Sequence, residues 1–254
     1  ARPGIGKGGL KLPSGILAGE NILFFLTQKS GNSAGIADFN QLSIPFRAVA
    51  ADINTGKAAV LGFGSLPMAM RASMSIPGAF KPISIDGQLL VDGGMVNQVP
   101  IDVVRAMGAD IVIAVDVGTP LAVIDDQSSI LAIGNQVTGF LTVGNTDASV
   151  ATLTEKDVLI RPQLGDDVTT TSFDPEKIAL ALAIGEEAAI LASDRLAVLS
   201  EPSVPLRQIT PSPDSKAMIS FIELNNNSLY EDVIFQSTLA PLNGKPLDYD
   251  HIAK

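Results

Sequence analysis

The chain has 254 residues, a formal net charge of −10, no cysteine and a single histidine, His251. Its acidic balance lacks the Lys/Arg footprint that nucleic-acid binding requires, and it argues equally against simple electrostatic docking on anionic lipid. Without cysteine and with one histidine near the C-terminus, the sequence argues against a thiol nucleophile, a disulfide framework, a zinc site and a Ser-His-Asp triad, so a hydrolase built from it would use a carboxylate as its base.

The first part of the chain is predicted to alternate short helices with short strands. The first twenty residues are rich in Gly, Lys and Pro, which predicts a loop or an entering segment, and the start of the chain has no apolar signal-peptide segment. Residues 54–57 and the pair Asp86-Gly87 are turn signals that join strands in pairs. Helices are predicted at residues 20–28 and 66–73, a polar loop at residues 31–40, and strands at residues 44–53, 58–63, 81–85 and 89–91.

The middle of the chain continues this alternation with longer helices. Helices are predicted at residues 101–107, 128–153 and 176–199, and strands at residues 110–117 and 157–162. No run of about 18 uninterrupted apolar residues is present, so no transmembrane helix is expected. The alternation predicts one α/β domain that reaches to about residue 200, with a sheet covered by helices on both faces.

The C-terminal part differs in composition. Residues 201–216 contain four prolines and predict an extended linker. After it, a strand is predicted at residues 219–224 and a helix at residues 229–239, followed by Gly244. This opening resembles that of a POTRA domain, the small α+β periplasmic module that precedes outer-membrane β-barrels, so residues 217–254 are interpreted as an incomplete POTRA-like segment.

The most informative position is Asp92, which ends an apolar strand and is followed by Gly93 and Gly94. A carboxylate delivered in this way lies at the end of a sheet strand, and the glycines remove Cβ atoms that would crowd a substrate. The triplet alone also fits an ordinary turn in which Asp bonds its own backbone. Arg71, Ser73 and Ser75 are interpreted as the polar end of a helix whose Met and Ala side chains pack into the core.

The flanking sequence decides between these alternatives. The segment at residues 71–80, the Asp92 triplet and the continuation at residues 97–100 resemble the second half of a patatin-like phospholipase domain; residues 12–15 and 19–23 extend the resemblance. It implies a patatin-like α/β fold and a Ser-Asp dyad with Asp92 as the base. It also implies a phospholipid or other acyl-ester lipid as substrate and no metal or cofactor, with Gly93 and Gly94 adjacent to the site.

The serine of such a dyad is harder to find. The one formal Gly-x-Ser-x-Gly match, residues 31–35, follows a predicted helix rather than an apolar strand, so Ser33 is interpreted as a loop residue. In the family, the oxyanion loop and the serine elbow lie upstream of the segment matched from about residue 7. The expectation is therefore that residues 1–200 are a patatin-like domain lacking its N-terminal third, and that this chain alone is inactive.

A patatin-like domain followed by a POTRA-like segment resembles bacterial outer-membrane patatin autotransporters. That resemblance implies export, with a periplasmic, cell-surface or secreted location, and an outer-membrane β-barrel in the same precursor. Two alternatives stay open: a non-catalytic passenger or scaffold module beside the barrel, and a different hydrolase with Ser33 as its nucleophile. A homo-oligomer is compatible with the sequence, and no nucleic-acid partner is expected.

Overall fold

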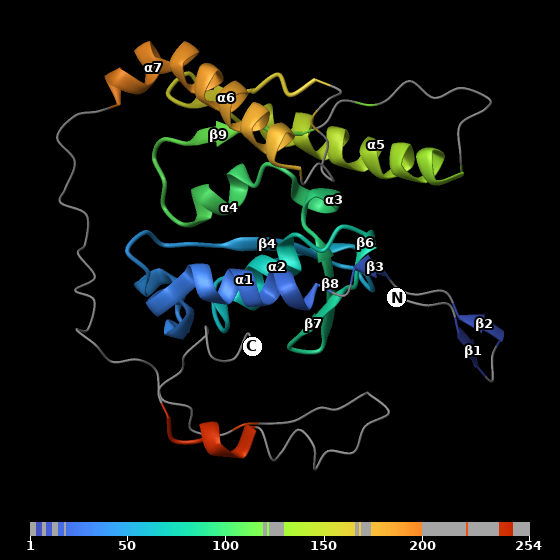
Figure 1. Ribbon diagram of the computed structural model, residues 1–254. Helices are drawn as coiled ribbons and strands as arrows, with labels where there is room; N and C mark the ends of the chain where they lie inside the picture. Colours follow the sequence, from blue (N-terminus) through green and yellow to red (C-terminus); the bar gives the residue numbers. More distant parts are fainter. Residues whose placement is uncertain are drawn as a thin grey trace.

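In the computed structural model, a four-stranded antiparallel sheet lies between helices on both of its faces (Figure 1). The structure describes residues 4–6, 9–11, 15–17, 19–118, 121, 130–165, 168, 174–199, 222 and 239–245. The fold is therefore mixed α/β, as the alternation of helices and strands predicts.

The sheet has the strand order β5-β4-β8-β7. Its strands are β4 (Ala48–Asp52), β5 (Lys57–Leu61), β7 (Ile83–Ile85) and β8 (Gln88–Asp92). Every residue of β4 is buried, since this inner strand is covered on both faces. The β7–β8 turn has positive φ at both Asp86 (49°) and Gly87 (78°), the backbone of a tight hairpin turn, as predicted.

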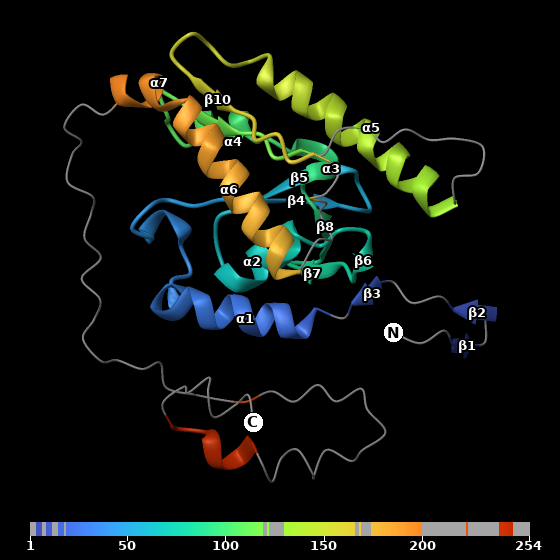
Figure 2. The same ribbon diagram turned by 45° about the horizontal axis from the view of Figure 1, so that its top comes forward.

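Helices cover the two faces of this sheet. On one face, α2 (Leu66–Ser73) contacts β4 and β8, and α1 (Glu20–Ser30) packs against α2. On the other face, α3 (Gly94–Asn97) contacts β4 and packs against α5 (Ile130–Val150), with α4 (Ile101–Ala106) beside them (Figures 1 and 2). Ala50, Ala59, Ala72 and Leu90 form one buried cluster, in which the small alanine side chains let the layers approach.

Three further strand pairs lie outside this sheet. β3 (Gly15–Leu17) pairs in parallel with β6 (Gly78–Phe80), and β9 (Ile113–Val115) pairs in parallel with β10 (Val158–Ile160). The antiparallel hairpin of β1 (Gly4–Gly6) and β2 (Gly9–Lys11) also precedes α1. The sequence predicts a loop or an entering segment over the first twenty residues and misses these three strands, because three-residue, glycine-containing strands carry no alternating apolar signal.

The predicted helix over residues 176–199 is divided at Ala192 into α6 (Pro175–Leu191) and α7 (Ser193–Val198). No residue of α6 is buried, and Leu182 and Leu191 are 71% and 81% exposed. None of the helices in the described chain is long and apolar enough to cross a membrane. The predicted linker at residues 201–216 lies outside the described residues. So does the POTRA-like segment, apart from Ile222 and residues 239–245, which include a 3₁₀ helix, Ala240–Leu242.

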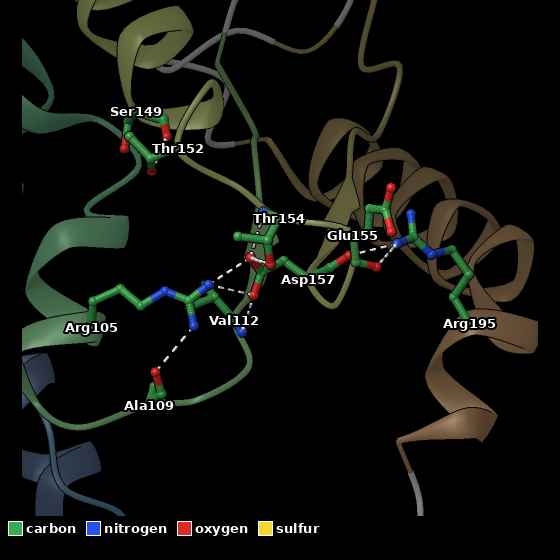
Figure 3. Close-up of polar contacts among 9 residues, drawn as sticks. All are labelled: Arg105, Ala109, Val112, Ser149, Thr152, Thr154, Glu155, Asp157 and Arg195. Atoms are coloured by element: carbon green, nitrogen blue, oxygen red, sulfur yellow. Dashed lines mark hydrogen bonds and ion pairs between the residues drawn. The ribbon is translucent and has the colours of Figure 1, made fainter.

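An ion pair between the half-buried Arg105 side chain and the buried Asp157 carboxylate joins α4 to the β9–β10 layer (Figure 3). The Asp157 carboxylate accepts hydrogen bonds from the Arg105 guanidinium (2.7 Å to Oδ1), the Val112 amide (2.8 Å) and the Thr154 amide (2.7 Å) and hydroxyl (2.8 Å). From α7, Arg195 donates to the Asp157 carbonyl oxygen (2.7 Å). The bonds from the Thr154 and Val112 amides, helped by those from the Thr154 hydroxyl and Arg105, hold the Asp157 pKa well below its usual range although burial opposes them.

Candidate active site

Asp92 is the last residue of β8 and lies opposite Ala50 of β4. Its amide donates to the Ser75 carbonyl oxygen (3.0 Å), and its Oδ1 accepts from the Gly94 amide (2.8 Å). Burial raises the pKa of the half-buried Asp92 carboxyl, and the bond from Gly94 opposes that shift. The result is an oriented carboxylate that is a stronger proton acceptor than an exposed Asp.

The backbone after β8 approaches β4 so closely that it requires glycine. A Cβ atom added at Gly93 would lie 2.1 Å from the Val49 carbonyl oxygen, and one at Gly94 would lie 2.0 Å from the Gln98 Oε1 atom and 3.0 Å from the Asp92 Oδ1 atom. At Gly93 the space is therefore taken by the backbone of β4 rather than left open for a substrate, which differs from the expected role of this glycine.

Replacing Gly93 by alanine is expected to destabilise the fold by about 1–3 kcal/mol, because the rigid backbone of β4 has to move. Gly144 is the matched control: it lies within α5 and an added Cβ there meets no atom within 4 Å. Gly144→Ala is expected to be neutral or to stabilise by up to about 1 kcal/mol. Thermal unfolding of both variants tests this, and equal effects would contradict the close approach at Gly93.

Arg71 braces the segment that holds Asp92. Its guanidinium is 1% exposed, donates to the Ser75 hydroxyl (2.7 Å) and lies 4.7 Å from the ring centroid of Phe80. Burial lowers its pKa, and its Nε has no hydrogen-bond partner among the described residues. Arg71 thus lies in the last turn of α2, and Ala69 and Ala72 of that helix are buried, as interpreted, but the sequence does not predict that the Arg71 side chain is itself buried. The i, i+4 spacing of Arg71 and Ser75 was the available signal, but it does not reveal that both side chains are buried.

Ser73 also helps to hold the segment next to Asp92 in place. Its hydroxyl donates to the Val49 carbonyl oxygen (2.6 Å), and its own carbonyl oxygen accepts from the Gly93 amide (3.4 Å). Together with the Ser75–Asp92 backbone bond, these contacts fix residues 73–75 against the end of β8. The flanking segment that singled out Asp92 in the sequence therefore holds it in place.

An open groove of about 440 Å³ lies beside Asp92, a volume within the usual range of small-molecule sites. Its lining combines half-buried apolar side chains with a few polar groups. The groove is lined by Phe46, Arg47, Ala48, Val49, Met70, Ser73, Met74, Asp92, Gly93, Gly94, Asn97, Gln98 and Pro100.

Ser33 does not line this groove. It lies in a 3₁₀ helix, Gly31–Gly35, that directly follows α1, so it lacks the strand–turn–helix setting of a nucleophile elbow, as the sequence context predicts. Within the described chain, no group of three or more His, Cys, Asp and Glu side chains is placed to hold a metal ion.

Asp116 accepts a hydrogen bond from the Gly118 amide (3.0 Å) and forms an ion pair with Arg161 (2.8 Å). These side chains line a separate cavity of about 280 Å³ between β9, β10 and α5. Asp116 is therefore not part of the Asp92 groove.

Comparison with known proteins connects the Asp92 segment to one family. Residues 61–105 match the patatin-like phospholipases. The chain is 40% identical over 102 residues to an uncharacterised NTE family protein of Mycobacterium tuberculosis, an alignment that covers 40% of this chain and 27% of the relative. It is also similar over 80 residues, 31% of this chain, to patatin-like phospholipase domain-containing proteins 7 of Mus musculus (46% identical) and 6 of Homo sapiens (44%), covering 6% of each.

The similarity to the patatin-like phospholipases is therefore local. The matched family segment contains β8, Asp92 and the bracing residues of α2. The aligned part of the chain spans about a quarter of the length of the mycobacterial relatives.

Proposed function

We propose that this chain carries the general base of a patatin-like lipid acyl hydrolase, with Asp92 as that base. The observation that carries the proposal is the half-buried, oriented Asp92 carboxylate, which lies beside an open groove and within the segment that matches the patatin-like phospholipases. Burial raises its pKa, which suits a carboxylate to accept a proton from an alcohol. We assign residues 1–200 to the hydrolase domain; the segment at residues 61–105 that matches the family lies within that range.

In the proposed mechanism, Asp92 accepts the hydroxyl proton of a serine that lies outside the 254 residues of this chain. The serine oxygen attacks the ester carbonyl, the alcohol leaves with the proton returned by Asp92, and an acyl-serine remains. Asp92 then takes a proton from a water molecule, whose oxygen attacks the acyl-serine. The serine oxygen leaves with that proton returned by Asp92, and the fatty acid is released. Residues 73–75 keep the carboxylate in one orientation throughout, through their backbone bonds to Asp92 and Gly93.

The substrate class follows from the family and from the groove. The mammalian relatives are named as patatin-like phospholipase domain-containing proteins, and apolar side chains line part of the groove beside Asp92. We therefore assign a phospholipid, or another lipid acyl ester, as the substrate.

The first test is labelling with a fluorophosphonate probe, which reacts covalently with activated serines, followed by peptide mapping. In a protein that contains this chain together with a Gly-x-Ser-x-Gly elbow, the label is expected on that elbow serine. Label on Ser33 would instead support the alternative hydrolase. Complete absence of label, with the fold intact by circular dichroism, would favour the non-catalytic scaffold.

Location is proposed from the C-terminal part of the sequence alone. Residues 201–216 would link the hydrolase domain to a POTRA-like segment at 217–254, which would lead to an outer-membrane β-barrel in the same precursor. The proline-rich composition of the first range and the strand–helix–Gly pattern of the second support this arrangement. The enzyme would then act outside the inner membrane, on lipids of the outer membrane or beyond it.

A further inference from the structure

We propose that the groove beside Asp92 binds a single acyl chain whose anionic headgroup is held by Arg47. This inference rests on the proposed function and deepens it, because it names the chemistry of the lipid. Two features carry it: an apolar wall of the groove that packs in part on the core, and the lining residue Arg47, whose guanidinium forms no salt bridge with a described carboxylate.

The apolar wall consists of Phe46, Met70 and Met74. All three side chains are half-buried, so each keeps surface that a ligand can cover. Phe46 and Met70 also pack on a core cluster, which fixes them from the other side. The core cluster consists of Phe39, Leu42, Ala48, Leu66 and Ala69. Methionine side chains adapt to the shape of a flexible ligand, so this wall suits an acyl chain better than a rigid planar molecule.

Arg47 is held in place by neutral groups. Its Nη1 donates to the Phe46 carbonyl oxygen (2.8 Å) and its Nη2 to the Asn40 side-chain oxygen (2.7 Å). The side chain also lies against Gly62, where an added Cβ would come within 2.7 Å of the Arg47 Nε atom. The guanidinium is thus oriented in advance of binding.

The charge of Arg47 remains available to a ligand. Neither of the two salt bridges in the described chain involves it. A guanidinium has five N–H donors in a planar fork, and the two bonds above leave donors for a carboxylate or phosphate. Asp92 is the one acidic residue that lines the groove, so a chain held by Arg47 lies in the same groove as the proposed base.

The test is binding to this chain, because it needs no nucleophile. The probes are 11-(dansylamino)undecanoate and its methyl ester, which share a chain and differ in headgroup charge, each below its micelle concentration. The wild-type chain is expected to bind the carboxylate about 3- to 10-fold more tightly than the ester. Arg47→Gln is expected to abolish this preference for the carboxylate. Met74→Gln is expected to lower the affinity for both probes by a similar factor.

Two variants locate the binding. Arg161→Gln removes an arginine that lines the separate cavity, so it is expected to leave the headgroup preference unchanged. Leu182→Gln changes an exposed apolar residue of α6, so it is expected to leave both affinities unchanged. If Leu182→Gln abolishes binding while Met74→Gln has no effect, the probe binds on α6 and the inference is wrong. An unchanged headgroup preference in Arg47→Gln also overturns it.

Displacement of the dansyl carboxylate identifies the headgroup. Stronger displacement by laurate than by dodecyl phosphate would assign Arg47 to a fatty-acid carboxylate, and the reverse order would assign it to a lipid phosphate. Absence of headgroup preference, with an elbow serine labelled by fluorophosphonate, would refute the inference and leave the proposed hydrolase function standing. If the chain prefers the carboxylate probe to its ester but no serine is labelled by fluorophosphonate, the result would support the lipid site and contradict the proposed hydrolase function.

Discussion

Replacing Asp92 by asparagine is expected to lower kcat/KM for short-chain ester hydrolysis by about 10²- to 10⁴-fold in a protein that also contains the serine elbow. Asparagine keeps an oxygen that can accept the Gly94 amide, so the turn after β8 remains intact. It cannot take a proton from a serine hydroxyl. Ester hydrolysis by purified protein, measured beside thermal unfolding, separates loss of chemistry from loss of fold.

The stability readout has a definite sign. Because burial raises the folded-state pKa of Asp92, ionising this group costs stability as pH rises through that pKa. Asp92→Asn removes this penalty, so at neutral pH its Tm is expected to equal or exceed that of the parent. In the pH profile of the parent's kcat/KM, the midpoint of the acidic limb is expected to lie above the ordinary aspartate pKa of about 4.

Two variants serve as controls for Asp92→Asn. Asp86→Asn changes another acidic residue, the exposed one in the β7–β8 turn, where asparagine tolerates the positive φ of 49°. It is expected to retain activity. Full turnover in Asp92→Asn would refute the dyad, and loss of activity in Ser33→Ala with Asp92→Asn active would transfer the chemistry to Ser33.

Local signals in the sequence predicted the elements around the site well. The helix expected at residues 66–73 is α2, with the Ser65 hydroxyl accepting from the Met68 amide as its N-cap. The Asp86-Gly87 signal predicted the β7–β8 turn, and with it the strand that ends at Asp92. Each of these features is encoded within a few neighbouring residues, so composition and spacing suffice to predict it.

Features that depend on distant contacts could not be predicted in the same way. The burial of Arg71 follows from its contact with Phe80 and its close approach to Gly19, which residue spacing does not reveal. The strict need for glycine at position 93 arises from the Val49 carbonyl oxygen of another strand. The parallel pairing of β3 with β6 joins segments some sixty residues apart in the sequence. In each case the contact partner is distant in the sequence and becomes a neighbour only in the folded chain.

The Arg105–Asp157 pair is the second place where one substitution is expected to have a large effect. Asp157→Asn is expected to lower the Tm at pH 7 by about 5–15 °C, because it leaves the Arg105 guanidinium without its counter-charge. The new amide group would also face the Thr154 or Val112 amide, so a donor would meet a donor. Thermal unfolding followed by circular dichroism measures this loss.

The pH dependence distinguishes a charge effect from a packing effect at Asp157. Hydrogen bonds lower the folded-state pKa of this carboxyl. The ionised carboxylate therefore stabilises the fold fully at pH values above the unfolded-state pKa of about 4, and this stabilisation declines as the pH falls towards the lower folded-state pKa. The Tm gap between parent and Asp157→Asn is therefore expected to be constant between pH 5 and 8 and to narrow below about pH 4. Asp116→Asn removes the carboxylate of the more exposed pair with Arg161 and is expected to change the Tm by less than about 2 °C. Equal losses in the two variants would show that net charge, rather than the buried pair, sets the stability of this layer.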